Sequence, residues 1–123
     1  NMIMSLLNFV SFNWKILTII FLVIIVCLSL NPLQEPNYHE SIHDKLYHIV
    51  AYLFLSIPVS LKRPKYYLLS YLIFILLGGL IELLQPYFNR QQELADFIAN
   101  IFGIFIGAFL GSFARKRYFK LIH

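Results

Sequence analysis

The sequence predicts an all-α integral membrane protein, one domain built as an antiparallel bundle of four transmembrane helices. Three observations lead to this prediction. Of the 123 residues, 59% are hydrophobic and only 13% are charged, and the mean hydropathy is +0.71, which is far from the values of a soluble domain with a polar surface. Four apolar segments have about the length that a bilayer requires. Short connections between them return each helix beside its predecessor.

The first expected span covers residues 14–30. Trp14 and Lys15 suit the membrane interface before the apolar run, and the uncharged residues 1–13 form an interfacial segment. Pro32 ends the helix, because proline cannot continue it. No A-x-A-like cleavage site follows, so we expect an uncleaved anchor and not a signal peptide.

The second expected span covers residues 45–61, after a polar, proline-containing loop over residues 31–43. Asp44 suits the start of this helix, where backbone N–H groups and the helix dipole favour negative charge. Pro58 is expected to kink it.

The third span covers residues 66–85 and the fourth residues 94–113. A basic turn separates the third span from the second, and Pro86 ends the third span. A basic tail follows the fourth span and begins at Arg115.

Charge predicts the orientation of these spans. In this topology eight lysines and arginines fall on one side and two on the other, so the positive-inside rule places both termini in the cytoplasm. All six carboxylates and three of the four histidines then fall on the extracytoplasmic side. The basic excess therefore indicates orientation, and we expect no nucleic acid as a partner.

Polar residues at the extracytoplasmic ends of the spans recur at steps of three or four, which places them in stripes on the helix faces. Because ionisable groups in a membrane are costly, such stripes more often mark a functional site than residues without a role. They comprise Asp44, His48 and Tyr52 on the second span, Glu82 and Gln85 on the third, and Asp96 and Asn100 on the fourth.

The fourth span also carries small residues at every fourth position, a pattern that lets a neighbouring backbone approach closely. They are Ala95, Ala99, Gly103, Gly107 and Gly111. We assign them to packing, and a ridge over Gly103, Gly107 and Gly111 is also a candidate surface for homo-oligomers.

Together these residues resemble the VanZ-like membrane proteins, a family of small, multi-spanning bacterial proteins named for a teicoplanin-resistance protein. The resemblance covers roughly residues 44–111. It implies a multi-pass protein of the bacterial cytoplasmic membrane and a link to glycopeptide resistance, without a settled reaction. It rests on D-K-x-x-H-x-x-x-Y from Asp44 to Tyr52, on E-x-x-Q at Glu82 and Gln85, and on Arg90, Asp96, Asn100, Gly103 and Gly107.

The candidate catalytic residues are Glu82, His48, Asp96 and Asp44. His48 or Glu82 would act as acid or base, oriented by Asp44 or Asp96. Three of the four have a structural alternative: His48 as a hydrogen-bonded packing residue, and Asp44 or Asp96 as a helix cap.

The candidate ligand-binding residues are Arg90, Lys45, Gln85, Asn100 and Tyr52. Arg90 is either a phosphate clamp or the internal counter-ion of Glu82 and Asp96. Lys45 either contacts a lipid phosphate or snorkels to the interface.

Three functions remain open at this point, and the sequence leaves open whether the protein is an enzyme. A proton-coupled transporter is disfavoured, because the polar groups lie at one face and no relay crosses the midplane. The polar site acts on or binds a lipid-linked envelope precursor or an amphiphilic antibiotic at the outer leaflet. Alternatively, it locks the helices of a non-enzymatic lipid- or partner-binding protein. In the third hypothesis a divalent metal is the cofactor, with Asp44, His48, Glu82 and Asp96 as its ligands.

Overall fold

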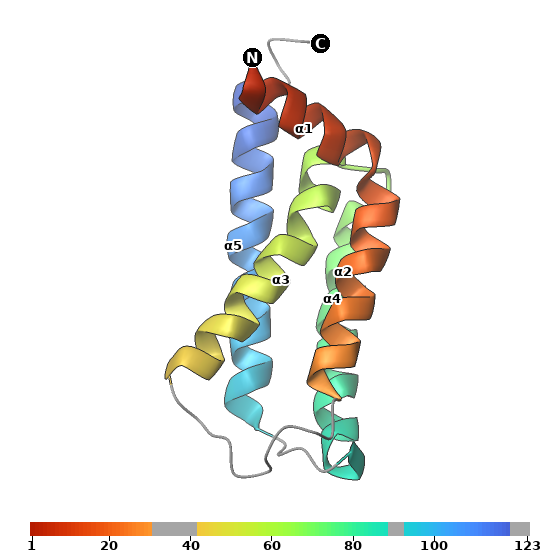
Figure 1. Cartoon of the computed structure of the whole chain (residues 1–123), viewed down its shortest axis with the longest axis vertical. Coiled ribbons are helices and arrows are strands. Elements are labelled where there is room, and N and C mark those ends of the chain that lie inside the picture. The colour runs from red at the N-terminus through yellow and green to blue at the C-terminus, as the bar shows by residue number, and fades with distance from the viewer. Residues whose placement is uncertain (31–41, 89–92, 119–123) are drawn as a thin grey trace.

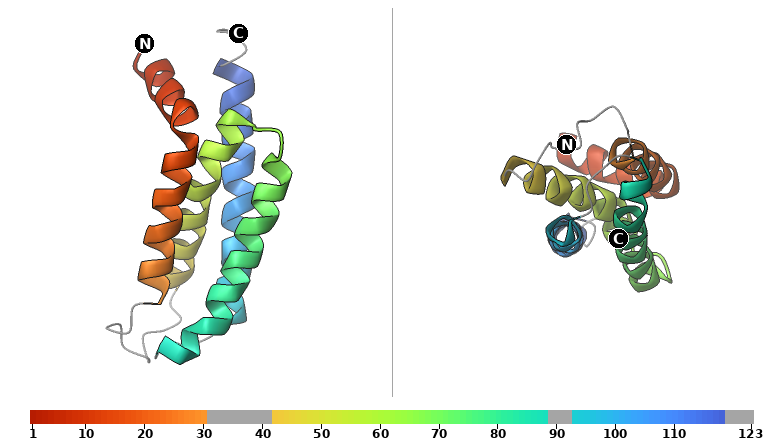
Figure 2. Two further views of the ribbon diagram at one scale, coloured as in Figure 1. Left: turned by 90° about the vertical axis from the view of Figure 1, so that its right-hand side faces the viewer. Right: turned by 90° about the horizontal axis from the view of Figure 1, so that it is seen from below.

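The computed structural model describes residues 1–30, 42–88 and 93–118, and within these ranges the side chains of residues 42–44 are not described. Every regular element in these ranges is helical (Figure 1). Helices α2 to α5 run in alternating directions along the long axis of the molecule (Figures 1 and 2). The elements are α1 (Met2–Phe12), α2 (Trp14–Ser29), α3 (Ile42–Lys62), α4 (Tyr67–Leu84), the 3-10 helix η1 (Gln85–Phe88) and α5 (Leu94–Tyr118).

Helix length and hydropathy support a membrane protein. In the described part of the chain, the segment Tyr67–Phe88 and helix α5 are each long and apolar enough to cross a membrane. Helices α1 and α2 pass the same test as a pair, although they are bent by 78° at their junction. The predicted all-helical class is confirmed.

Residues Met2–Phe12 form a helix, α1, which the sequence did not predict. The side chain of Asn1 accepts a hydrogen bond from the backbone N–H of Met4 at 3.0 Å and so caps α1. At the other end, the backbone and side-chain N–H groups of Asn13 both donate to the carbonyl oxygen of Phe9. The chain turns there into α2, and α1 lies across one end of the bundle (Figure 1).

Helix α3 is the central element of the bundle. It contacts α1, α2, α4 and α5, and Leu55, Ser56 and Ser60 are completely buried. The two serine hydroxyls donate to carbonyl oxygens one turn earlier, at 2.9 and 2.8 Å. The neighbouring helices cover α3, so it can carry more polar residues than α4. For this reason α3 is not among the helices that pass the hydropathy test.

The glycines of α5 allow α3 to pack directly on its backbone. A Cβ atom added at Gly103 would lie 2.4 Å from the carbonyl oxygen of Ile49, and one at Gly107 would lie 2.4 Å from that of Leu53. At Gly111 the added atom would lie 2.4 Å from the Cβ of Ser60. The ridge is therefore covered by α3 of the same chain. The predicted contact between copies through this ridge stays a prediction.

Helix α5 continues beyond its predicted end at residue 113, through Tyr118. Its last turns contact α3: Arg115 Nη1 donates to the carbonyl oxygens of Leu61 at 2.7 Å and Lys62 at 3.1 Å. These carbonyls lie at the C-terminus of α3, where the helix dipole favours a cation. Part of the predicted basic tail therefore serves as a cap between two helices.

Candidate functional site

The polar stripes of α3 and α5 face each other at the end of the bundle where α5 begins. Lys45 Nζ lies 2.5 Å from Glu93 Oε2 and 2.6 Å from Asp96 Oδ1. The three side chains are only 21%, 13% and 7% exposed. Hydrogen bonds between charged groups are roughly twice as strong as neutral ones, so this contact ties α3 to the first turn of α5.

His48, one turn further along α3, also faces α5. Its Nδ1 lies 2.9 Å from Asn100 Oδ1 and its Nε2 lies 3.5 Å from Asp96 Oδ2. Asn100 offers an acceptor oxygen, so the hydrogen of that bond lies on Nδ1. Both ring nitrogens therefore face α5, and an imidazolium ring would have an oxygen opposite each N–H group.

Helix α4 approaches the polar cluster of α3 and α5 at Tyr52. The Tyr52 side chain is 2% exposed. A Cβ atom added at Gly78 would lie 3.3 Å from the Tyr52 hydroxyl oxygen and 3.2 Å from Asn100 Nδ2. Because Gly78 has no side chain, α4 can lie against these two polar groups. The predicted stripes of α3 and α5 thus meet α4 beneath the charged contact.

Glu82 lies beside this cluster without a direct contact to His48. Its Oε2 accepts a hydrogen bond from the backbone N–H of Glu93 at 3.1 Å. Its Oε1 is buried and has no hydrogen-bond partner among the residues that the structure describes. The side chain is 5% exposed, so this carboxylate is held inside the protein with one oxygen unpaired.

Gln85 belongs to another contact. Its Nε2 donates to the backbone carbonyl oxygen of Ser29, at the end of α2, at 3.1 Å. Two residues three apart on a helix point about 60° apart, so Glu82 faces α5 whereas Gln85 faces α2. The structure therefore does not bring Gln85 together with Glu82, and the ligand-binding role of Gln85 stays a prediction.

Two predicted site residues cannot be assessed. Arg90 lies outside the described ranges, and of Asp44 only the backbone, in the first turns of α3, is described. One participant was missed: Glu93, the second carboxylate on Lys45. Glu93 lies three residues before Asp96, so both carboxylates are near the start of one helix. This spacing is the sequence feature from which Glu93 could have been predicted.

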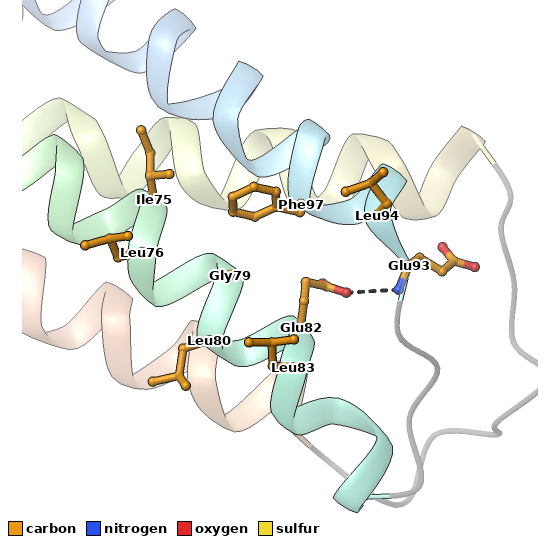
Figure 3. Close-up of a pocket in the computed structure, with 9 residues that line it drawn as sticks. All are labelled: Ile75, Leu76, Gly79, Leu80, Glu82, Leu83, Glu93, Leu94 and Phe97. Atoms are coloured by element: carbon orange, nitrogen blue, oxygen red, sulfur yellow. Dashed lines mark hydrogen bonds between the residues drawn. The ribbon is translucent and has the colours of Figure 1, made fainter.

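An apolar groove of about 470 Å³ lies between α4 and α5 (Figure 3). Several lining residues are open to the surroundings of the bundle, among them Leu76 at 62% and Leu80 at 50% exposure. Figure 3 shows the Glu82 side chain reaching from α4 toward Glu93 at one end of this groove. The lining consists of Ile75, Leu76, Gly79, Leu80, Glu82, Leu83, Glu93, Leu94 and Phe97.

Among the side chains that the structure describes, no group of three His, Cys, Asp or Glu residues is arranged to hold a metal ion. In the proposed ligand set, Asp96 faces His48 and Lys45, whereas Glu82 binds a backbone N–H group. The arrangement combines a polar cluster between α3 and α5 with an apolar groove that has the side chain of Glu82 at one end. Comparisons of the chain with protein-family models, with curated proteins and with solved structures find no match.

Proposed function

We propose that this chain is a multi-pass membrane protein that binds a lipid-like amphiphile without transforming it, with the alkyl chain of the amphiphile in the groove between α4 and α5. The four helices α2 to α5 would cross the bilayer as an antiparallel bundle with both termini in the cytoplasm, as the distribution of basic residues suggests. The polar cluster of α3 and α5 would then lie at the extracytoplasmic face of a bacterial cytoplasmic membrane.

The observation that carries this proposal is the composition of the groove. Its volume of about 470 Å³ falls within the about 300–1,000 Å³ of small-molecule sites, which are mostly apolar with a few placed polar groups. Leu76, Leu80 and Leu83 are each at least half exposed along it. In a membrane these side chains meet lipid tails, so an alkyl chain enters without leaving an apolar environment.

The polar cluster supports a binding protein more than an enzyme. A general base needs a lone pair directed at its substrate, but both ring nitrogens of His48 face Asn100 and Asp96 on α5. The ammonium of Lys45 is likewise engaged with Glu93 and Asp96. These contacts suit a lock between helices, where interhelical polar contacts contribute about 1 kcal/mol each.

The resemblance to the VanZ-like family suggests what the amphiphile is. A lipid-linked envelope precursor or an amphiphilic antibiotic would present its polar part at the depth of the cluster and its chain to the groove. In that case binding would reduce the amount of free amphiphile in the outer leaflet, and this would connect the protein to glycopeptide resistance.

Photolabelling tests the groove. The purified full chain in lipid nanodiscs would be labelled with a phospholipid whose palmitoyl chain carries a diazirine, and the labelled peptides identified by mass spectrometry. Leu76→Trp fills the groove, and Leu72→Trp is its matched control because Leu72 lies one turn away on α4 at 49% exposure. The proposal predicts that Leu76→Trp lowers labelling of α4 and α5 about tenfold relative to Leu72→Trp. Equal labelling of both variants would refute it.

A further inference from the structure

Six basic residues in the turn between α3 and α4 and in the last turns of α5 lie at the same end of the bundle (Figures 1 and 2). The side-chain carboxylates that the structure describes belong to Glu82, Glu93 and Asp96 and lie at the opposite end, where α4 ends and α5 begins. No described carboxylate therefore balances the positive charge of the basic end. The six residues are Lys62, Arg63, Lys65, Arg115, Lys116 and Arg117.

Arg63, the first residue after α3, has an unusual backbone conformation. Its φ of 53° lies in the left-handed region, and no other residue apart from glycine has a positive φ in the described part of the chain. Its backbone N–H donates to the carbonyl oxygen of Val59 at 2.7 Å and so ends the helix. Glycine is the usual residue at this position, because it has no Cβ to clash. Such outliers cluster at functional sites, which suggests that the arginine side chain has a role of its own.

The Arg63 guanidinium is held in place and is still accessible. Its Cζ lies 4.7 Å from the centroid of the Tyr67 ring, and its Nη2 donates to the Tyr67 hydroxyl at 3.1 Å. This hydrogen bond uses one of the five N–H groups of the guanidinium, and Arg63 is exposed. The end of α3 does not need Arg63 as a cap, since Arg115 already donates to the carbonyl oxygens of Leu61 and Lys62. Tyr67 thus positions a cation that has donors left for a ligand.

The residues around Arg63 indicate which ligand this is. Tyr66 directly precedes α4 and Tyr67 begins it, and tyrosines at the end of an apolar span lie at the level of the lipid headgroups. The anionic group found at that level is the phosphate of a phospholipid. A guanidinium binds phosphate through two parallel N–H···O hydrogen bonds, whereas lysine acts as a point charge. An arginine held at this depth therefore suits a lipid phosphate.

We propose that the turn between α3 and α4 binds the phosphate group of an anionic phospholipid, with the Arg63 guanidinium as its clamp. Tyr67 positions the clamp, and Lys62 and Lys65 add positive charge from the same turn. A headgroup with a net negative charge is preferred over zwitterionic phosphatidylcholine, because the lysines repel the choline cation. This site lies at the end of the bundle opposite the polar cluster of α3 and α5, and it does not depend on what occupies the groove between α4 and α5.

Native mass spectrometry of the purified full chain tests the preference, by titration in detergent with phosphatidylglycerol and phosphatidylcholine of identical acyl chains. We expect the anionic lipid to bind about tenfold more tightly, and Arg63→Gln should lower its affinity about tenfold. Arg117→Gln removes the same charge and is the matched control. Arg117 lies two positions after Arg115, about 200° round α5, and so points away from α3. Its replacement should change the affinity less than about twofold.

A second variant separates the side chain of Arg63 from its backbone. Arg63→Gly removes the guanidinium as Arg63→Gln does, but only glycine adopts the left-handed conformation without steric cost. In detergent without lipid, Arg63→Gly should therefore melt at a higher temperature than Arg63→Gln, whereas both should bind phosphatidylglycerol about equally weakly. Arg63→Lys keeps the charge without the planar fork and should have an intermediate affinity.

The remaining outcomes would overturn the proposal. Equal affinity of the unmodified chain for the two lipids would do so whether or not the variants fold. Equal losses of affinity in Arg63→Gln and Arg117→Gln would show a diffuse attraction to the whole basic end and would remove Arg63 as the clamp. Displacement of phosphatidylglycerol by millimolar inorganic phosphate at constant ionic strength would make the ligand a soluble anion and not a lipid.

Discussion

His48 and Asn100 are 52 positions apart in the sequence, yet His48 Nδ1 lies 2.9 Å from Asn100 Oδ1. The contact joins α3 to α5 at the level where Gly78 lets α4 approach Asn100 and Tyr52. Asn100 is 2% exposed, so its amide depends on this kind of partner. The pair therefore fixes the register of the two helices whose backbones are in closest contact.

Replacing His48 by Leu should lower the free energy of unfolding by about 1 kcal/mol, because the buried Asn100 amide loses a partner. The double variant with Asn100→Leu should be less destabilised than the sum of the single variants, since neither residue is then left unpaired. Unfolding in mixed micelles with increasing dodecyl sulfate measures all four proteins. Strictly additive effects would show that the contact does not contribute to stability.

Lys45→Met should destabilise the protein by about 1–3 kcal/mol, because Glu93 and Asp96 lose the ammonium group between them. Lys45→Arg keeps the charge and serves as the control, with a smaller expected loss. The same unfolding assay compares the two. If Lys45→Met were as stable as the unmodified chain, the ion pair would not be the lock that we describe.

Gly107→Ala should be destabilising by about 1–3 kcal/mol, since the added Cβ would lie 2.4 Å from the carbonyl oxygen of Leu53 and must push α3 away. Gly79→Ala is a matched control on α4, where the nearest atom to the added Cβ belongs to the Phe97 ring, at 3.3 Å. Thermal unfolding in detergent should show a clear deficit for Gly107→Ala and a smaller one for Gly79→Ala. Similar melting temperatures for the two variants would contradict the direct α3–α5 contact.

Arg115→Ala should cost about 1 kcal/mol, because the last carbonyl groups of α3 lose a charged donor at the negative end of the helix dipole. Arg117→Ala removes the same charge from an exposed position of the same helix and should have little effect on stability. Hydrogen exchange at the C-terminal end of α3 measures the difference locally. Equal protection in both variants would rule out the cap.

Helical spacing predicted which of these side chains share a helix face. The four-residue steps through His48 and Tyr52 and through Asp96 and Asn100 place each pair on one helix face, and the structure brings the two faces together. The all-helical class followed equally from hydropathy. Both depend on local periodicity, which a sequence contains.

The remaining features depend on how helices are placed in three dimensions. Nothing in the spacing of Gly103 and Gly107 says whether their ridge is covered by α3 or by another chain, because any backbone can approach it. Gln85 was assigned to the site because it is three residues from Glu82, but α4 lies between α2 and α5, so the two face different neighbours. The groove arises from the separation of α4 and α5, which no local motif encodes.

The central claim is that an alkyl chain occupies the groove between α4 and α5, and nuclear Overhauser effects measure this directly. The full chain, with protonated methyl and aromatic groups in otherwise deuterated nanodiscs, would be mixed with a palmitoyl phosphatidylethanolamine whose chain is protonated. We predict cross-peaks from chain methylenes to the Phe97 ring and the Leu80 methyl groups, stronger than those to Leu72 and lost in Leu76→Trp. Cross-peaks of equal strength at Leu72 and Phe97, unchanged in that variant, would contradict the account.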